Sequence, residues 1–244
     1  MAVDEALLTN YQQGNAQPTV RVYRWQPACV SLGYFQRWSD VNHAARQACG
    51  VEVVRRLTGG RAILHGDELT YSVVVSEEQL GTRGVLATFR HLSEGVVAGL
   101  ARLGITAELK ALAEPRPREA EANCFAAVAR CDLVCDGRKL VGSAQLRRIG
   151  TVLQHGSLPL SFDHAAATEL LPGASDLRTR IIDLREAAGN PSLWTDCVAQ
   201  ALQAGFAAAL RIEFIEGELS ATEWALAESL AKTKYATSEW TQRR

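Results

Sequence analysis

The feature that most constrains the fold is a change of hydrophobic period in the first half of the chain. From residue 69 to 75, Leu, Tyr, Val and Val occupy the odd positions and alternate with mostly polar residues, as in a strand. Apolar residues then recur at helical spacing up to Gly104: Leu86, Phe89, Leu92, Val96, Val97, Leu100 and Leu103. A strand followed by a long amphipathic helix predicts a sheet with one face covered by that helix.

Shorter patterns before and after this region predict the remaining elements. Helices are expected over 2–13 and 41–49, the second with Ser39 or Asp40 as its cap and Gly50 as its end. Strands are expected over four segments: 20–25, 29–34, 51–56 and 62–64. Segment 114–122 reads as a loop.

The second half begins with hairpin signals and ends with helix signals. Asp136 with Gly137, and Ile149 with Gly150, predict a three-stranded meander from Leu133 to about Leu158. A helix is expected from Pro191 to about Leu210, and a capping box of Ser220 and Glu223 opens another. The fold class predicted is α/β (α+β), with mixed sheets flanked by helices.

Length and charge limit the domain count and the kinds of partner. The 244 residues, 47% of them hydrophobic, predict one domain over 1–244, with helices of about 191–244 packed on it. The 26 basic and 27 acidic residues nearly cancel, so neither nucleic acid nor a membrane surface is expected as a partner. No signal peptide or apolar membrane span is apparent, and we expect a cytoplasmic protein.

One run carries the strongest chemical signal. Residues 55–72 read RRLTGGRAILHGDELTYS, with two arginines and a Gly-Gly turn between two predicted strands. Glycines let backbone amides approach a ligand, and amides together with guanidinium groups can hold a carbonyl or phosphate oxygen. By itself a Gly-Gly turn of this kind favours the interpretation of an ordinary hairpin with a charged edge.

The whole run resembles the signature of the lipoate protein ligase and octanoyltransferase family, within the biotin/lipoate ligase superfamily. Four further segments resemble that family in the same order along the chain: MAVDEALL at the start, SLGYFQ at 31–36, DGRKLVGSAQ at 136–145 and KYATSEW at 234–240. The resemblance therefore covers nearly the whole chain and implies a biotin/lipoate ligase-like catalytic domain.

Details of the motifs resemble the transferases of this family more than its ATP-dependent ligases. Arg61 stands where the ligases usually carry a third glycine, and the residues after His65 are Gly66, Asp67 and Glu68. Asn-Cys-Phe at 123–125 resembles the nucleophile segment of a cysteine-dependent octanoyltransferase subgroup. The resemblance implies that Cys124 carries the acyl group as a thioester and that Lys139 favours the thiolate, with no cofactor.

The resemblance also implies a set of substrate-binding residues. They are Arg55, Thr58, Gly59, Gly60, Arg61, His65, Gly142, Ser143, Ala144, His155 and Gly156. Non-catalytic alternatives stay open: Cys124 as a buried core thiol, Lys139 as a solvated hairpin lysine, and His65 and His155 as structural histidines. Val73, Leu140 and Val141 are expected near the acyl chain, while Cys131 and Cys135 are expected to be structural.

The implied partners are octanoyl acyl carrier protein as donor and a lipoyl-domain or glycine-cleavage H-type protein as acceptor. We expect both to dock at one basic mouth formed by seven cations: Arg55, Arg56, Arg61, Arg138, Lys139, Arg147 and Arg148. Two alternatives remain for the function. One is an ATP-dependent lipoate or octanoate ligase, and the other is a non-catalytic acyl-binding homologue.

Overall fold

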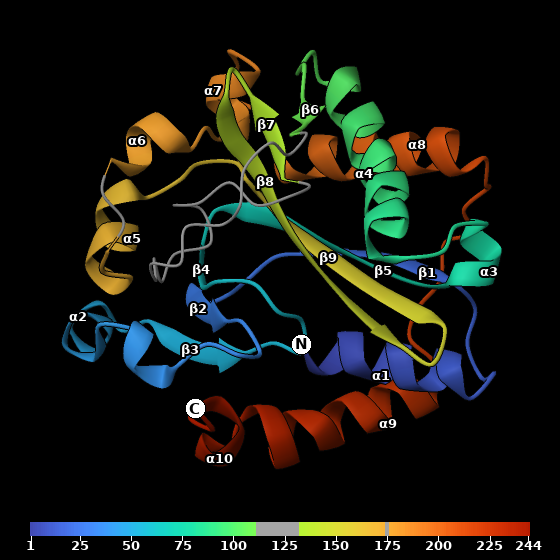
Figure 1. Ribbon diagram of the computed structural model, residues 1–244, viewed down its shortest axis with the longest axis horizontal. Helices are drawn as coiled ribbons and strands as arrows, with labels where there is room; N and C mark the ends of the chain where they lie inside the picture. Colours follow the sequence, from blue (N-terminus) through green and yellow to red (C-terminus); the bar gives the residue numbers. More distant parts are fainter. Residues whose placement is uncertain (111–131, 174–175) are drawn as a thin grey trace.

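A six-stranded antiparallel sheet forms the centre of the protein in a computed structural model, which describes residues 1–110, 132–173 and 176–244. Its long strands cross the molecule diagonally in Figure 1. The strands, in their order across the sheet, are β1 (Thr19–Tyr23), β5 (Glu68–Ser76), β9 (Thr151–Pro159), β8 (Arg138–Arg148), β7 (Leu133–Cys135) and β6 (Glu108–Leu109).

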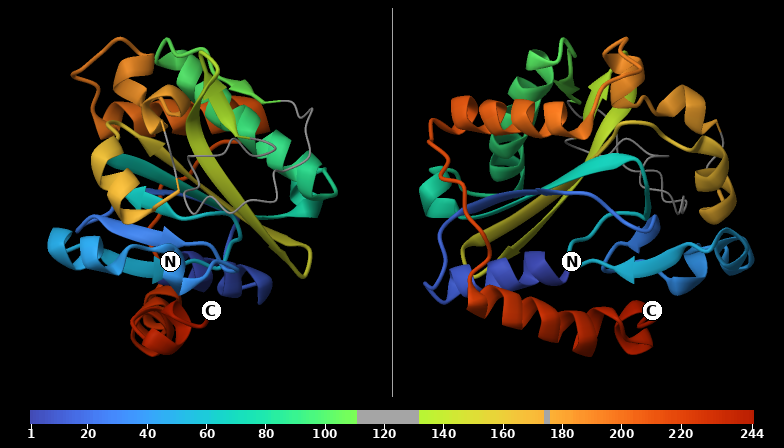
Figure 2. Two further views of the ribbon diagram at one scale, coloured as in Figure 1. Left: turned by 60° about the vertical axis from the view of Figure 1, so that its left-hand side comes forward. Right: turned by 180° about the vertical axis from the view of Figure 1, so that it is seen from behind.

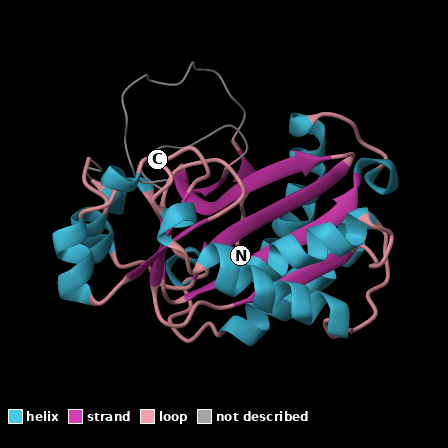
Figure 3. Cartoon of the chain, turned by 90° about the horizontal axis from the view of Figure 1, so that it is seen from below, coloured by secondary structure: helices cyan, strands magenta, loops and turns pink. Residues whose placement is uncertain are grey.

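Helices cover both faces of this sheet. On one face lie α4 (Val85–Arg102) and α8 (Thr195–Leu210), and on the other α1 (Ala2–Gln12) with α9 (Ala221–Leu230) (Figures 1 and 2). The view from below in Figure 3 shows helices lying across the strands on that second side. The prediction of a long helix covering the strand of residues 69–75 is confirmed, but the sheet has two covered faces rather than one.

The burial of β5 shows why its alternating pattern allows two covered faces. Its odd-numbered residues, such as Val73, pack in the main core with Leu92 of α4 and Leu202 of α8. On the opposite side Val74 packs against Leu7 and Leu8 of α1. The polar residues between them are buried as well, and Ser72 donates a hydrogen bond to Asp4 on α1 (2.9 Å).

A smaller sheet lies beside the first and carries part of the site. It contains β3 (Glu52–Arg55), β2 (Cys29–Leu32) and β4 (Ile63–His65), with β2 parallel to β3 and antiparallel to β4. Its core residues Val30, Leu32 and Val53 pack against α2 (His43–Cys49) and α5 (His164–Leu170). All four residues of β2 are buried, which fixes the side chains at this edge of the site.

Most predicted elements are confirmed, with small shifts at their ends. Both two-residue hairpin turns occur where expected, and the Ser220 capping box opens α9. Two predictions are wrong: α8 begins at Thr195 rather than Pro191, and Asn42 caps α2 through the amide of Ala45 (3.2 Å). Segment 114–122 lies outside the described residues.

Several short helices were not predicted, because they lack the length for a clear period. They are η1 (Trp38–Asp40), α3 (Glu77–Leu80), α5, α6 (Leu177–Arg180), α7 (Leu184–Ala187), the π-helical η2 (Ala231–Tyr235) and α10 (Ser238–Thr241). Within the described part of the chain, no helix is long and apolar enough to span a membrane. That the whole chain is one domain stays a prediction.

Candidate functional site

A narrow pocket lies between the small sheet and strands β5, β9 and β8 of the large sheet. Its empty volume is about 340 Å³, part of which is open to solvent. Six predicted site residues line it: His65, Gly142, Ser143, Ala144, His155 and Gly156. Two family segments, far apart in sequence, therefore meet at one pocket.

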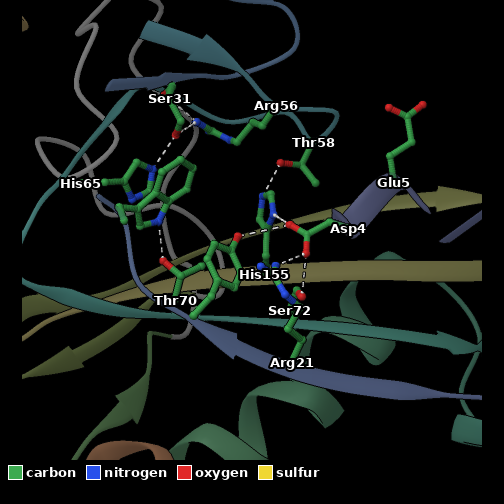
Figure 4. Close-up of polar contacts among 12 residues, drawn as sticks. Asp4, Glu5, Arg21, Ser31, Arg56, Thr58, His65, Thr70, Ser72 and His155 are labelled. Atoms are coloured by element: carbon green, nitrogen blue, oxygen red, sulfur yellow. Dashed lines mark hydrogen bonds and ion pairs between the residues drawn. The ribbon is translucent and has the colours of Figure 1, made fainter. Parts of the chain in front are cut away.

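His65 on β4 is held by partners on both ring nitrogens. Its Nε2 lies 2.7 Å from Ser31 Oγ and its Nδ1 lies 2.9 Å from Glu68 Oε1 (Figure 4). The ring stacks on Trp25, with 4.0 Å between ring centroids. Trp25 in turn donates its indole N–H to Thr70 Oγ1 (2.9 Å), so the imidazole is fixed in position and in plane.

His155 on β9 lies across the pocket and is fixed differently. Its Nε2 is 2.6 Å from Thr58 Oγ1, while its Nδ1 is 3.9 Å from Asp4 Oδ2, which is too far for a hydrogen bond (Figure 4). Burial lowers the pKa of His155 below its usual value, against the opposing influence of Asp4. The imidazole therefore stays neutral near pH 7.

The two arginines of the motif point to different places. Arg56 lines the pocket and donates to the carbonyl and hydroxyl oxygens of Ser31 (2.8 and 3.1 Å) and to the carbonyls of Gly59 and Arg61 (2.9 and 2.6 Å). The neighbouring Arg55 is buried elsewhere and binds carbonyl oxygens, including those of residues 33, 36 and 241. Arg55 thus joins the tail of the chain to the small sheet and does not line the pocket.

The Gly-Gly turn is positioned by close backbone packing. A Cβ atom added to Gly33 would lie 1.9 Å from the carbonyl oxygen of Gly60, so only glycine fits at residue 33. The turn is therefore held against the SLGYFQ segment. Thr58 touches the pocket only through His155, whereas Gly59, Gly60 and Arg61 do not line it.

Lys139 is completely buried near the start of β8. Its ammonium lies 2.8 Å from the carboxylate of Asp132, whose side chain is 3% exposed. Its backbone carbonyl accepts from Ile182 N–H (3.0 Å). The alternative of a solvated hairpin lysine is therefore wrong. Lys139 does not line the pocket, and because Cys124 and Cys131 lie outside the described residues, the pairing of Cys124 with Lys139 stays a prediction.

The expected basic mouth is not formed. Arg55, Arg56 and Lys139 are buried, and Arg147 and Arg148 lie at the opposite end of β8, about 30 Å from Lys139 at roughly 3.3 Å per strand residue. The residues expected beside the acyl chain are also elsewhere, since all three belong to the main core: Val73, Leu140 and Val141.

The sequence argument missed several residues of the site. Ser31, Trp25, Thr70 and Ser157 line the pocket, and Glu68 lies directly behind His65. Ser31 and Glu68 both fall inside motifs quoted above, so the motifs themselves were the available signal. Among the described residues, no three His, Cys, Asp or Glu side chains are grouped to hold a metal ion.

Comparison with known proteins relates the chain to a family. Residues 1–207 match the lipoyl protein ligase A/B catalytic domain. Two curated relatives are the octanoyltransferases LipM of Kyrpidia tusciae and Brevibacillus brevis, which are 43% and 39% identical to this chain. Each alignment covers all of this chain and 94% of the relative.

Solved structures agree in fold. Lipoate-protein ligase A bound with ATP has a TM-score of 0.85 and 29% identity, with 99% of this chain and 92% of the other covered. A bi-partite lipoate protein ligase from Thermoplasma acidophilum has a TM-score of 0.79 and 29% identity, with 99% and 89% covered. The predicted family and fold class are confirmed, and the chain belongs to the lipoyl protein ligase A/B catalytic domain family.

Proposed function

We propose that this protein is a cytoplasmic octanoyltransferase of lipoate biosynthesis. It takes an octanoyl group from acyl carrier protein and passes it to a lysine of a lipoyl-domain or glycine-cleavage H-type protein. The observation that carries the proposal is the likeness, over the whole chain, to octanoyltransferases at 43% and 39% identity.

The proposed chemistry proceeds in two steps through Cys124. The thiolate attacks the donor thioester, so that the acyl group moves to Cys124 and the carrier thiol leaves. The acceptor amine then attacks the enzyme thioester, an amide forms and the thiolate is released. A thioester donor is already activated, so the reaction requires no ATP.

Lys139 has the properties that this chemistry needs from a cation. Its ion pair with Asp132 favours the ammonium form although the side chain is fully buried. A buried ammonium close to a thiol lowers the pKa of the thiol, and it also stabilises the oxyanion that develops on the thioester carbonyl. Both effects are stronger at a buried position that excludes water.

The lining of the pocket has the character expected for an acyl site. Its lining combines apolar side chains such as Trp25 and Ile63 with a few fixed polar groups. Burial of six methylenes contributes roughly 5 kcal/mol at about 0.8 kcal/mol each, before ordering costs. Each methylene then discriminates only about fourfold, so chain length is selected by the closed end of the pocket.

The ligase alternative draws on the likeness to lipoate-protein ligase A at 29% identity. One feature of the site argues against a nucleotide here. The Glu68 carboxylate is buried directly behind His65, and a buried negative charge is an unfavourable neighbour for a triphosphate. We therefore favour the carrier-protein thioester as donor.

Intact-mass analysis tests donor, nucleophile and cofactor together. The protein is mixed with octanoyl carrier protein without ATP, and we expect one octanoyl adduct that moves to an added lipoyl domain. Cys124→Ala should abolish both the adduct and the acceptor modification, while the matched Cys135→Ala variant should keep them. Acceptor modification that needs ATP and free octanoate supports the ligase instead, and no modification in either condition supports an acyl-binding homologue.

A further inference from the structure

The hydrogen bonds around Ser31 fix the position of its proton. Its Oγ lies 3.1 Å from Arg56 Nη1 and 2.7 Å from His65 Nε2. The Glu68 carboxylate can only accept, so the imidazole proton is on Nδ1 and is donated to Glu68 Oε1 (2.9 Å). In this tautomer Nε2 carries no proton and accepts from the Ser31 hydroxyl, while Arg56 donates to the same oxygen. The tautomer of His65 is thus assigned from its partners.

Glu68 completes a fixed chain of three groups. Its Oε1 also accepts from Thr70 Oγ1, and its Oε2 accepts from Ser157 Oγ (2.8 Å). Both His65 and Glu68 are buried, with 4% and 2% exposure. Serine, histidine and carboxylate are therefore hydrogen-bonded in series, and their protons are placed so that the hydroxyl group can pass its proton to the histidine. Such an arrangement is recognised by its geometry rather than by sequence position.

The second step of the proposed reaction needs such a base. A free lysine amine has a pKa of about 10.4, so at pH 7 only about one in two thousand is uncharged and able to attack a thioester. Lys139 does not suit this task, because its ion pair with Asp132 favours the ammonium form, which is an acid. In the pocket, Ser31 and His65 are both lining residues.

We propose that Ser31, His65 and Glu68 form the proton relay that deprotonates the acceptor lysine; this inference rests on the proposed function. The acceptor ammonium donates to Ser31 Oγ, and its proton moves onto Oγ while the hydroxyl proton moves to His65 Nε2. The freed amine attacks the thioester carbonyl, so that the C–N bond forms and the C–S bond breaks. The second proton of the nitrogen goes to the Cys124 thiolate, and imidazolium later releases the first to water.

The three members have different roles. Ser31 is a catalytic residue, because it touches the substrate amine, whereas His65 and Glu68 act through it. The Glu68 carboxylate stabilises the imidazolium that forms. Other charged or titratable residues line the two cavities that His65 borders or lie opposite it on β2. They are Arg56, His155, Tyr23 and Met1 with its amino terminus in the pocket, Asp67, Asp163 and Cys49 in the second cavity, and Cys29 on β2.

Separate measurement of the two half-reactions tests the relay. Ser31→Ala and the nearly isosteric Glu68→Gln should still form the octanoyl enzyme, seen by intact mass. At pH 7 and saturating lipoyl domain, single-turnover transfer to lysine should be slowed about 100-fold or more. The deficit should shrink towards pH 9.5, because more of the lysine is then uncharged. Matched controls are Ser93→Ala and Glu223→Gln, which alter a buried hydroxyl and a buried carboxylate outside the pocket.

Hydroxylamine, which is uncharged at neutral pH, separates base catalysis from general damage. It should release the acyl group from the variants as fast as from the wild-type enzyme, while lysine does not. An equal loss with both amines, or normal transfer to lysine by either variant, overturns the relay. If Ser31→Ala does not fold, Glu68→Gln alone decides. Absence of an acyl enzyme in the wild type overturns the proposed function, and the relay with it.

Discussion

The two ends of β8 have similar turns and similar charge but lie in different environments. Each end carries a two-residue turn with both residues at positive φ: Asp136 and Gly137 at 51° and 71°, Ile149 and Gly150 at 51° and 68°. Each turn has two basic residues beside it on β8. Turn chemistry and local charge therefore do not distinguish the two ends.

Burial distinguishes them. At the first turn, Lys139 is fully buried against Asp132, under the backbone that continues from α6. At the second, Arg147 is partly exposed and pairs with Glu77, while Ile149 is 83% exposed. Only the first end can use a cation for chemistry, because a solvated cation is screened and exerts little field on a reacting group.

The largest difference should appear in stability. Asp132→Asn removes the charge that compensates buried Lys139, and we expect a loss of roughly 3 to 5 kcal/mol in the free energy of unfolding. Glu77→Gln breaks the partly exposed pair at the other end and should lower the urea midpoint far less. Urea denaturation of both variants measures the contrast. Equal losses would mean that Lys139 finds another compensating group.

Activity should show the next largest difference. Lys139→Ala should slow acylation by octanoyl carrier protein about 100-fold at pH 7, because both the thiolate and the developing oxyanion lose their cation. Partial rescue is expected above the ordinary thiol pKa of about 8.5. Arg147→Ala is the matched control and should stay within twofold. A comparable loss in Arg147→Ala would restore a docking role for the second end.

Much of the fold could be predicted because it is encoded locally. The alternation of residues 69–75, the helical period of 86–103 and both hairpin turns are properties of short windows. The family motifs likewise predicted that segments 55–65, 123–125 and 137–157 line one cleft, and residues of the first and last of these do line the pocket. What they could not predict is orientation: Arg55 ends β3 and Arg56 follows it, yet their side chains bind in different places.

Long-range partners were the part that the sequence could not provide. Asp132 lies seven residues before Lys139 and pairs with it only because β7 and β8 form a hairpin. Ser31 lies 34 residues from His65, and the link is made by pairing of β2 with β4. Periodicity carries no information on such contacts. For the same reason the sequence could not show that the cations predicted to form one basic mouth lie apart, some buried and some at the far end of β8.

A smaller effect should be equal at the two ends. Gly137→Ala and Gly150→Ala place a Cβ in open space but at positive φ, so each should cost about 1 to 2 kcal/mol from backbone strain alone. Thermal unfolding of the two variants measures this. A clearly larger loss for Gly137→Ala would show that the buried end depends on its turn geometry to hold Lys139, and would link the turn to the site.

The smallest effect concerns the titration of Glu77 at the exposed end. The hydrogen bond from Arg147 lowers the pKa of this carboxyl below its usual value, with a further contribution from the Gly84 amide. A depressed carboxyl pKa stabilises the folded protein above the unfolded pKa, and that stabilisation is lost as pH falls through the folded value. In Arg147→Ala the pKa of Glu77 should rise towards its usual value, as followed by NMR titration of the side-chain carboxyl carbon. If the pKa does not move, the Gly84 amide rather than Arg147 sets it, and the second end of β8 then carries no functional ion pair at all.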